Sequence, residues 1–425
     1  MDSRHDTASD DRTPPRGDPR SAASLGLLAV GLLLVGLNLR IGVASVGPVL
    51  VDIRASLGLS AAGASLLTAI PVVAFGAFAF LTPSLTRRFG LHRLLGLALL
   101  VLVAGILLRS LPGVGMLFVG TVLIGAAIGI GNVVMPPAIK KDFARWAGLM
   151  MGLYSTALFV GAALASGLTV PMLAAVGRDW RAALAIWAIP AVLALVVWIP
   201  QIVRSARDAR GTAAPSLQGE PPFRAILRDP VALSVTALMG LQSMSYYAAL
   251  TWIPTVLVDA GLPAGTAGWM LSFSAFPGIV ASLVTPALAR RVRVTWSPIV
   301  IAAALTAVAI IGLLFAPVPE PAAYVWMALL GLGQGASISL SLSFIVWRSP
   351  DTHHTGHVST MAQGFGYLFA GLGPIGLGVL HAATDGWVVP LVALVVMLAV
   401  QALAGVAASR PRHVGSRLRE EAIPR

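Results

Sequence analysis

Residues 81–88 read LTPSLTRR, and residues 284–291 read VTPALARR, 203 positions later. Two further pairs of segments match at nearly the same distance: GIGN at 129–132 with GLGQ at 331–334, and GLN at 36–38 with GLQ at 240–242. Glycine-rich segments can match by chance in one place, but three matches at nearly the same distance indicate an internal repeat. The sequence therefore predicts two halves that are related as parallel repeats.

The composition is typical of an integral membrane protein. Of the 425 residues, 57% are hydrophobic and only 11% are charged, whereas soluble domains carry roughly 25% charged residues. A soluble protein cannot cover that much apolar surface. The lack of cysteine excludes a disulfide-rich scaffold, and continuous apolar runs argue against an outer-membrane barrel. We therefore predict an all-α integral membrane fold.

Twelve apolar segments account for most of the chain, as two bundles of six transmembrane helices. They lie at 24–50, 61–85, 94–111, 115–138, 147–174, 180–202, 230–258, 265–288, 297–317, 322–346, 357–381 and 386–408. Each is long enough to cross a bilayer, and the first is too long for a signal peptide. The predicted domains are a disordered tail at 1–23, a bundle at 24–202, a linker at 203–228, a bundle at 229–409 and a basic tail at 410–425.

Basic residues predict the orientation of these segments. With the N-terminus inside, 24 of the 29 Lys and Arg fall on the inner side. Four fall in outer loops or helix ends: Arg54, Arg109, Arg178 and Arg181. The positive-inside rule then places both termini in the cytoplasm of a multi-pass plasma-membrane protein. The same rule explains the net charge of +12 without a nucleic-acid partner.

Arg40 is the one ionisable residue that these spans leave within the membrane. No Asp, Glu or Lys lies at comparable depth, so its partners must be neutral dipoles, water or an anionic ligand. Placing an arginine there costs at least about 2.5 kcal/mol, which makes it a functional candidate. Its planar donor fork suits small oxyanions. The alternative is a structural arginine that bonds backbone carbonyls.

Three motifs carry a family resemblance. They are NLR at 38–40 followed by VGP at 46–48, GNVVMP at 131–136 leading to IKKDF at 139–143, and GLMMGLYS at 148–155. This set resembles the cyanate-porter and 2-nitroimidazole-porter group of the major facilitator superfamily. The resemblance implies a transporter that works by alternating access, with its substrate site between the halves near the midplane.

The same resemblance identifies a gating loop with one departure. The superfamily's loop after the second helix reads Gly-x-x-x-Asp-Arg-x-Gly-Arg followed by Arg or Lys, and residues 83–93 here read PSLTRRFGLHR. Arg87 replaces the acidic residue, which puts any gating charge relay through that residue in doubt. We assign the gating motif to Arg87, Arg88, Gly90 and Arg93, with Arg290 and Arg291 at the repeated place.

Further candidate substrate-binding residues surround Arg40 in this interpretation. Asn38, Asn132, Gln242 and Gln334 are included because the resemblance implies that the first, fourth, seventh and tenth helices line the cavity. Tyr154, Tyr246 (or its neighbour Tyr247) and Gln363 join them, and Tyr367 lies one turn beyond Gln363. The alternative for each amide is a polar contact between helices, and for each aromatic ring packing or interfacial anchoring.

His353, His354 and His357 could form a metal cluster. No cysteine or second ligand group supports a closed site, so we expect no metal and no cofactor.

The leading functional hypothesis is a secondary or facilitative transporter for a small anion or small heterocycle, acting as a monomer in the bilayer. Multidrug-type efflux is the main rival and predicts a larger aromatic cavity that tolerates substitution of Arg40. A membrane enzyme would need a catalytic constellation that the spans lack, and a non-transporting receptor is a third option. No Walker motif is present. A coupling proton would need a histidine or the substrate itself, because no membrane carboxylate is available.

Overall fold

The computed structural model describes residues 22–211, 223–315 and 319–416. Most of the predicted N-terminal tail, the middle of the predicted linker and the end of the C-terminal tail lie outside the described residues. Every regular element within the described ranges is helical, so the predicted all-α fold is confirmed.

The first half of the protein comprises α1 to α9. Their bounds are α1 Ala22–Ala44, η1 Gly47–Val49, α2 Leu50–Leu57, α3 Ala61–Ala79, α4 Thr82–Phe89, α5 Leu91–Arg109, α6 Val114–Asp142, η2 Ala144–Trp146, α7 Ala147–Ala175, α8 Trp180–Ile186 and α9 Ala188–Gly211. The second half comprises α10 to α17. Their bounds are α10 Phe223–Ile226, α11 Pro230–Asp259, α12 Ala264–Ala289, α13 Ser297–Gly312, α14 Glu320–Trp347, α15 Thr352–Ala370, α16 Leu372–Thr384 and α17 Val388–Ala408.

In the described part of the chain, ten of the twelve predicted segments correspond to helices that are long and apolar enough to cross a membrane. Nine of them are continuous or nearly so, and the tenth is a bent pair of helices. The remaining two predicted segments are α11 and α13. α11 has 30 residues, and its polar Gln242, Ser243 and Ser245 lower its hydropathy. α13 is apolar but has only 16 residues.

Two segments differ in shape from the prediction. The segment predicted at 61–85 bends by 58° between α3 and α4, where Pro83 occupies the first turn of α4; proline favours a new helix start at that position. The segment predicted at 24–50 continues through α2 to Leu57. It ends there because Gly58 adopts a left-handed conformation with φ of 63°, which commonly terminates helices.

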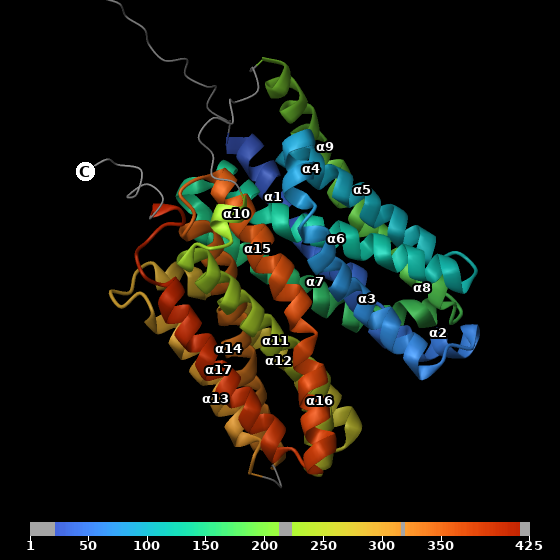
Figure 1. Cartoon of the computed structure of the whole chain (residues 1–425). Helices are drawn as coiled ribbons and strands as arrows, with labels where there is room; N and C mark the ends of the chain where they lie inside the picture. Colours follow the sequence, from blue (N-terminus) through green and yellow to red (C-terminus); the bar gives the residue numbers. More distant parts are fainter. Residues whose placement is uncertain (1–21, 212–222, 316–318, 417–425) are drawn as a thin grey trace, which may run out of the picture.

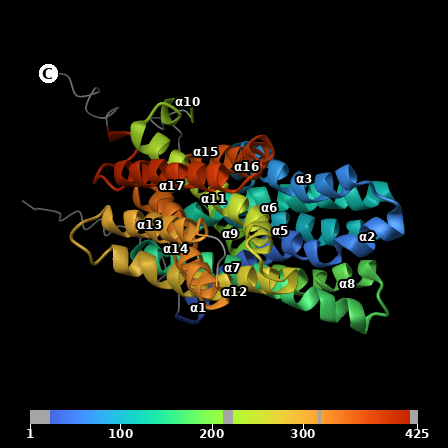
Figure 2. The same cartoon turned by 90° about the horizontal axis from the view of Figure 1, so that it is seen from below.

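The two halves form two bundles that lie against each other toward one end and diverge toward the other (Figure 1). We call the converging end the basic end; it holds the connections at 86–93 and 140–147 and the α14–α15 connection at 348–351. In the view from below, the bundles lie side by side (Figure 2). Contacts between the halves pair α7 with α12, and α15 with α3 and α6.

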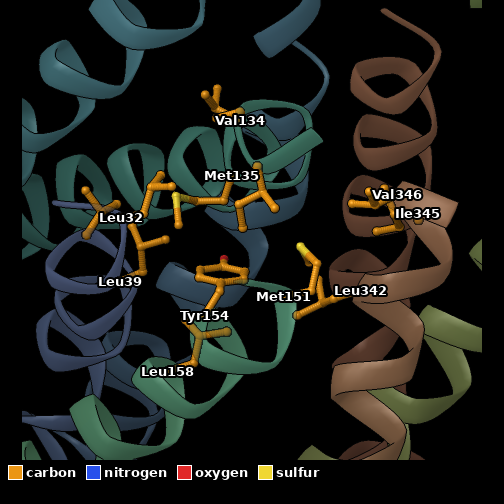
Figure 3. Packing of buried hydrophobic residues seen from close by; sticks show 14 of the residues in the cluster. Leu32, Leu39, Val134, Met135, Met151, Tyr154, Leu158, Leu342, Ile345 and Val346 are labelled. Atoms are coloured by element: carbon orange, nitrogen blue, oxygen red, sulfur yellow. The ribbon is translucent and has the colours of Figure 1, made fainter. Parts of the chain in front are cut away.

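The hydrophobic cores follow the same division. One core, which we call the shared core, combines buried residues of both halves, such as Met135, Met151 and Leu342. Figure 3 shows Met151 of α7 pointing toward Leu342 of α14. Two other cores each belong to one half: one includes Ile53 and Trp180, and the other includes Ile253 and Leu394. The halves are therefore packed as one body at the basic end and as two bodies at the opposite end.

Candidate functional site

Arg40 lies where the two halves meet. It is half-buried on α1, and its Nη1 donates a hydrogen bond of 3.1 Å to the hydroxyl of Tyr247 on α11. This bond joins the first half to the second. No acidic side chain of the described residues interacts with the guanidinium. The hydrogen-bond partner of Arg40 is therefore a neutral hydroxyl, and it belongs to the other half.

Tyrosines surround this guanidinium. Four of the five tyrosines of the protein lie close enough to interact with it electrostatically: Tyr154, Tyr246, Tyr247 and Tyr367. Their hydroxyls can donate or accept hydrogen bonds, and their rings offer flat apolar surfaces. We call Arg40 and these four residues the tyrosine cluster.

Aromatic contacts between helices hold the rings of the tyrosine cluster in place. Tyr246 meets Tyr247 edge to face at 5.4 Å between ring centroids and lies 6.4 Å from Phe159 of α7. Tyr367 meets Phe75 of α3 at 5.5 Å. The contacts with Phe159 and Phe75 both cross between the halves, so the cluster depends on both of them.

Two buried amides lie beside the cluster. The Tyr154 hydroxyl donates to Asn132 Oδ1 at 2.9 Å, and Gln363 Nε2 donates to the backbone carbonyl of Asn132 at 2.7 Å. Asn132 Nδ2 and Gln363 Oε1 have no hydrogen-bond partner among the described residues, although both atoms are buried. Buried polar atoms in proteins are nearly always bonded. A free donor and a free acceptor at this place suit a polar ligand or ordered water.

Glycine makes room for Tyr154 in this arrangement. A Cβ atom at Gly36 of α1 would lie 2.9 Å from the Tyr154 ring, too close for any larger residue without movement. Figure 3 shows the Tyr154 ring enclosed by α1, α6 and α7, near Leu39, Met135 and Leu158. The packing therefore fixes the direction of the Tyr154 hydroxyl toward Asn132.

The structure does not join the other predicted amides to the tyrosine cluster. Asn38 Nδ2 donates to the carbonyls of Leu34 and of Pro190 on α9, at 2.8 and 3.0 Å. This bond ties α1 to α9. Asn38 and Arg40 are two residues apart on α1, so their side chains point roughly 200° apart around the helix. Gln242 and Gln334 are buried on α11 and α14. Gln242 Oε1 accepts a 3.4 Å bond from Ser243, and Gln334 Nε2 has no partner among the described residues.

A lysine of the IKKDF motif, which the sequence analysis did not assign to the site, crosses the interface at the basic end. Lys140 Nζ of α6 donates to the carbonyls of Val346 and Ser349, at 3.1 and 2.9 Å, where α14 ends. A cation is favoured at a helix C-terminus, where carbonyls lack partners. We call these two bonds the Lys140 latch. The Ser359 hydroxyl of α15 adds a further bond between the halves, to the Val133 carbonyl at 2.8 Å.

The predicted gating residues lie near this end but make mostly local contacts. Arg87 donates to Ser84 at 3.3 Å, Arg88 lies over the Phe89 ring, and Arg93 donates to the Ser205 carbonyl of α9 at 3.3 Å. Gly90 adopts a φ of 77° between α4 and α5, which glycine tolerates without strain.

The corresponding residues of the second half, Arg290 and Arg291, are exposed. The Arg290 side chain lies beside Gly148 of α7 in the first half. Next to the first loop, His92 Nε2 and Asp142 Oδ2 form a buried pair 2.7 Å apart between α5 and α6.

The histidines at the start of α15 are not arranged as a metal site. No group of three His, Asp or Glu side chains in the described ranges could hold a metal ion. His354 Nδ1 instead lies 2.8 Å from the Asp351 carboxylate, and His353 packs against His357. Although partial burial raises the pKa of the Asp351 carboxyl, hydrogen bonds from His354 hold it below its usual value.

Arg109 lies at a helix end, as the sequence predicts, but its side chain is buried. We counted it among the residues of outer loops and helix ends, and it is indeed the last residue of α5. However, its side chain is only 1% exposed and bonds to α1. The first half therefore contains a fully buried arginine besides the half-buried Arg40. Hydropathy along the sequence could not reveal it, because burial within a bundle depends on the neighbouring helices.

Comparison with known proteins identifies relatives over most of the chain. The family model described as Major Facilitator Superfamily matches residues 28–374. The uncharacterized transporter YycB of Bacillus subtilis is 39% identical over 389 residues, which cover 91% of this chain and 94% of that protein. The 2-nitroimidazole transporter of Escherichia coli is 35% identical and covers 91% and 96%. The cyanate transport protein CynX of Escherichia coli is 32% identical and covers 84% and 90%.

Solved structures support the same fold. The proton:xylose symporter XylE bound to 6-bromo-6-deoxy-D-glucose superposes with a TM-score of 0.73 at 14% identity, over 95% of this chain and 96% of that chain. FucP in the outward conformation superposes with a TM-score of 0.64 at 13% identity, over 89% and 98%. At such identities the likeness concerns the fold alone.

Proposed function

Since the chain belongs to the major facilitator superfamily and is a membrane transporter rather than an enzyme, we propose that it carries a small polar solute with Arg40 as the anchor. The solute is a small anion of the cyanate kind or a small heterocycle of the nitroimidazole kind, as the names of two relatives suggest. The observation that carries this proposal is the guanidinium of Arg40, which has no carboxylate partner in the described residues and bonds a tyrosine of the opposite half.

The chemistry of the tyrosine cluster supports a small planar or anionic solute. A guanidinium presents a rigid fork of donors that matches planar acceptors. An anion also compensates a positive charge that is costly within a membrane. The free atoms Asn132 Nδ2 and Gln363 Oε1 can add one donor and one acceptor. The rings of Tyr246 and Tyr247 can pack against a flat heterocycle.

The packing of the two halves supports alternating access as the mechanism. At the basic end the halves share one core and are joined by the Lys140 latch. At the opposite end each half keeps its own core. We propose that the basic end faces the cytoplasm, as the positive-inside rule indicates. Both termini then lie in the cytoplasm of a plasma-membrane protein, and the described conformation is closed toward the cytoplasm.

The position of Arg40 links binding to this movement. The bond from Arg40 to Tyr247 crosses the interface between the halves. The affinity for a solute held by both side chains would therefore depend on how the two halves are positioned. A ligand shifts such an equilibrium only through a difference in affinity between the two states. A coupling proton and a monomeric state remain predictions.

Multidrug-type efflux is the second candidate function. The observation that favours it is the concentration of aromatic rings around Arg40, including Phe75 and Phe159. Such a surface can pack against bulky apolar molecules. This candidate differs in one respect: it does not need the charge of Arg40.

A thermal-shift panel on purified protein in detergent separates the two candidates. The panel holds cyanate, nitrate, bicarbonate, 2-nitroimidazole and a lipophilic cation, and compares wild type with Arg40→Gln. A ligand that binds only the folded protein raises its apparent melting temperature. We expect stabilisation by a small anion or azole that is lost in Arg40→Gln. Arg54→Gln, at an exposed arginine of the same span, is the control.

Stabilisation by the lipophilic cation alone, equal in wild type and Arg40→Gln, would replace the proposed function with multidrug efflux.

A further inference from the structure

Arg109 is a fully buried cation whose hydrogen bonds are incomplete. Its Nη1 donates to the Gly42 carbonyl at 2.6 Å, and its Nη2 donates to the Ser45 hydroxyl at 3.0 Å. These bonds hold the end of α1 just before the break at Gly47. The Nε–H has no acceptor among the described residues.

No acidic side chain compensates the charge of this guanidinium in the described part of the chain. The bonds to Gly42 and Ser45 supply dipoles rather than a counterion. A buried charge that is neither paired nor fully hydrogen-bonded is strongly unfavourable in a low-dielectric interior. The site therefore has an excess of positive charge that a small anion would remove.

A cavity of about 40 Å³ lies beside this side chain. It is enclosed by α1, α3, α5 and α6, and its wall includes Arg109, Gly42, Val46, Pro71 and Thr121. One water-sized sphere needs roughly 10–15 Å³, so the cavity has room for a halide ion but not for an organic substrate. Most of its wall is apolar, which favours a weakly hydrated anion over a strongly hydrated one.

We propose that this cavity binds a small monovalent inorganic anion of halide size, held by the Arg109 guanidinium. The anion accepts a hydrogen bond from the Arg109 side chain and balances its charge. Both helices that hold Arg109 in place, α1 and α5, belong to the first half. The site is therefore internal to one bundle and separate from the tyrosine cluster at the interface, and it does not depend on the proposed function.

Bromide is the probe, because it resembles chloride in size and can be located by its anomalous scattering. Crystals of the full-length protein grown in bromide should show an anomalous peak in the cavity beside Arg109. In parallel, bromide should raise the apparent melting temperature of wild type relative to gluconate at the same ionic strength. The rise should saturate with bromide concentration.

Three variants assign this effect to the cavity. Arg109→Gln removes the charge, and Thr121→Leu fills the cavity while leaving the guanidinium in place; both should abolish the bromide-dependent shift. Arg178→Gln is the control, because Arg178 is an exposed cation that pairs with Asp52 at 3.2 Å. It should keep the full shift. If Arg109→Gln does not fold, Thr121→Leu and the anomalous map still decide the question.

Three results would overturn the proposal. The first is a cavity that holds only water in bromide-grown crystals. The second is a bromide-dependent shift that survives in Thr121→Leu. The third is a shift that disappears in Arg40→Gln but persists in Thr121→Leu, which would place the bromide in the tyrosine cluster.

Discussion

Arg40 and Arg109 are both arginines within membrane helices, and neither has a carboxylate partner among the described residues. Arg40 is half-buried and bonds Tyr247 of the other half. Arg109 is fully buried and bonds Gly42 and Ser45 of its own half. A bond within one half persists when the halves move, whereas a bond across the interface does not need to. The partner of a buried charge, rather than its depth, therefore indicates whether it serves stability or transport.

The largest effect on stability should come from Arg109→Met. This change leaves the Gly42 carbonyl and the Ser45 hydroxyl without their charged donor. Two hydrogen bonds to a charged group contribute about 3–6 kcal/mol together, and removal of the unfavourable buried charge offsets part of this loss, so we expect the free energy of unfolding to fall by roughly 2–4 kcal/mol. The measurement is the apparent melting temperature in detergent. Arg178→Met, at an exposed and salt-bridged arginine, should change it little.

An Arg109→Met protein as stable as wild type would contradict the structural role that this comparison assigns to Arg109.

Substitution of Arg40 should weaken ligand binding and leave the stability of the protein nearly unchanged. Loss of a charge-assisted contact with the solute should weaken binding by roughly 10- to 100-fold in Arg40→Gln. Arg40→Lys keeps the charge but loses the planar fork, so its affinity should lie between the two. The apparent melting temperature without ligand should stay close to that of wild type. Titration of the best ligand against all three proteins by calorimetry tests this order.

Equal affinity in wild type and Arg40→Gln would remove Arg40 from the binding site and leave both arginines structural.

Lys140 extends the comparison to another contact between the halves. Lys140→Met removes two hydrogen bonds to the end of α14 and should favour opening at the basic end by roughly tenfold. The chain contains no native cysteine, so the labelling rate of a single cysteine introduced between the halves at this end reports opening without background. Lys141→Met, at the exposed neighbouring lysine, is the control and should leave the labelling rate unchanged.

A labelling rate that is the same in Lys140→Met and wild type would show that the latch does not hold the basic end closed.

The smallest of these effects should follow from Tyr247→Phe. The ring stays, but the hydroxyl that bonds Arg40 is lost. Loss of a hydrogen bond between this hydroxyl and the solute should cost about 1 kcal/mol, so ligand affinity should fall roughly fivefold. The control is Tyr324→Phe, because Tyr324 packs against Phe273 and is the one tyrosine outside the cluster. Unchanged affinity in Tyr247→Phe, measured by the same titration, would place the solute away from this hydroxyl.

The sequence was sufficient for the fold, and it marked Arg40 as a charge within a predicted span. Continuous apolar runs and the repeat predict the helical segments. A charge within an apolar span marks Arg40 as a candidate site residue, and this does not require knowledge of its neighbours in space. The bend between α3 and α4 was missed because the apolar run of α3 continues as far as Leu81, although Pro83 offered a signal. The extension through α2 was missed because Asp52 and Arg54 read as the end of the span.

The partners of the site residues could not be read in the same way. Tyr247 and Arg40 are 207 positions apart, and Lys140 is 206 positions from Val346. No local pattern encodes such contacts. Asn38 was assigned to the site by its repeat match, but the helical angle to Arg40 turns it toward α9. Arg109 was assigned to an outer helix end because hydropathy gives position along a helix, not burial between helices.

Solute flux in proteoliposomes tests the central claim most directly. Vesicles that contain wild type, Arg40→Gln or Arg54→Gln would be loaded with unlabelled cyanate or 2-nitroimidazole and diluted into the labelled solute, so that exchange reports transport. The account predicts exchange in wild type and in Arg54→Gln for at least one of the two solutes, and its loss in Arg40→Gln. Exchange at the wild-type rate in Arg40→Gln would contradict the role of Arg40 as the anchor.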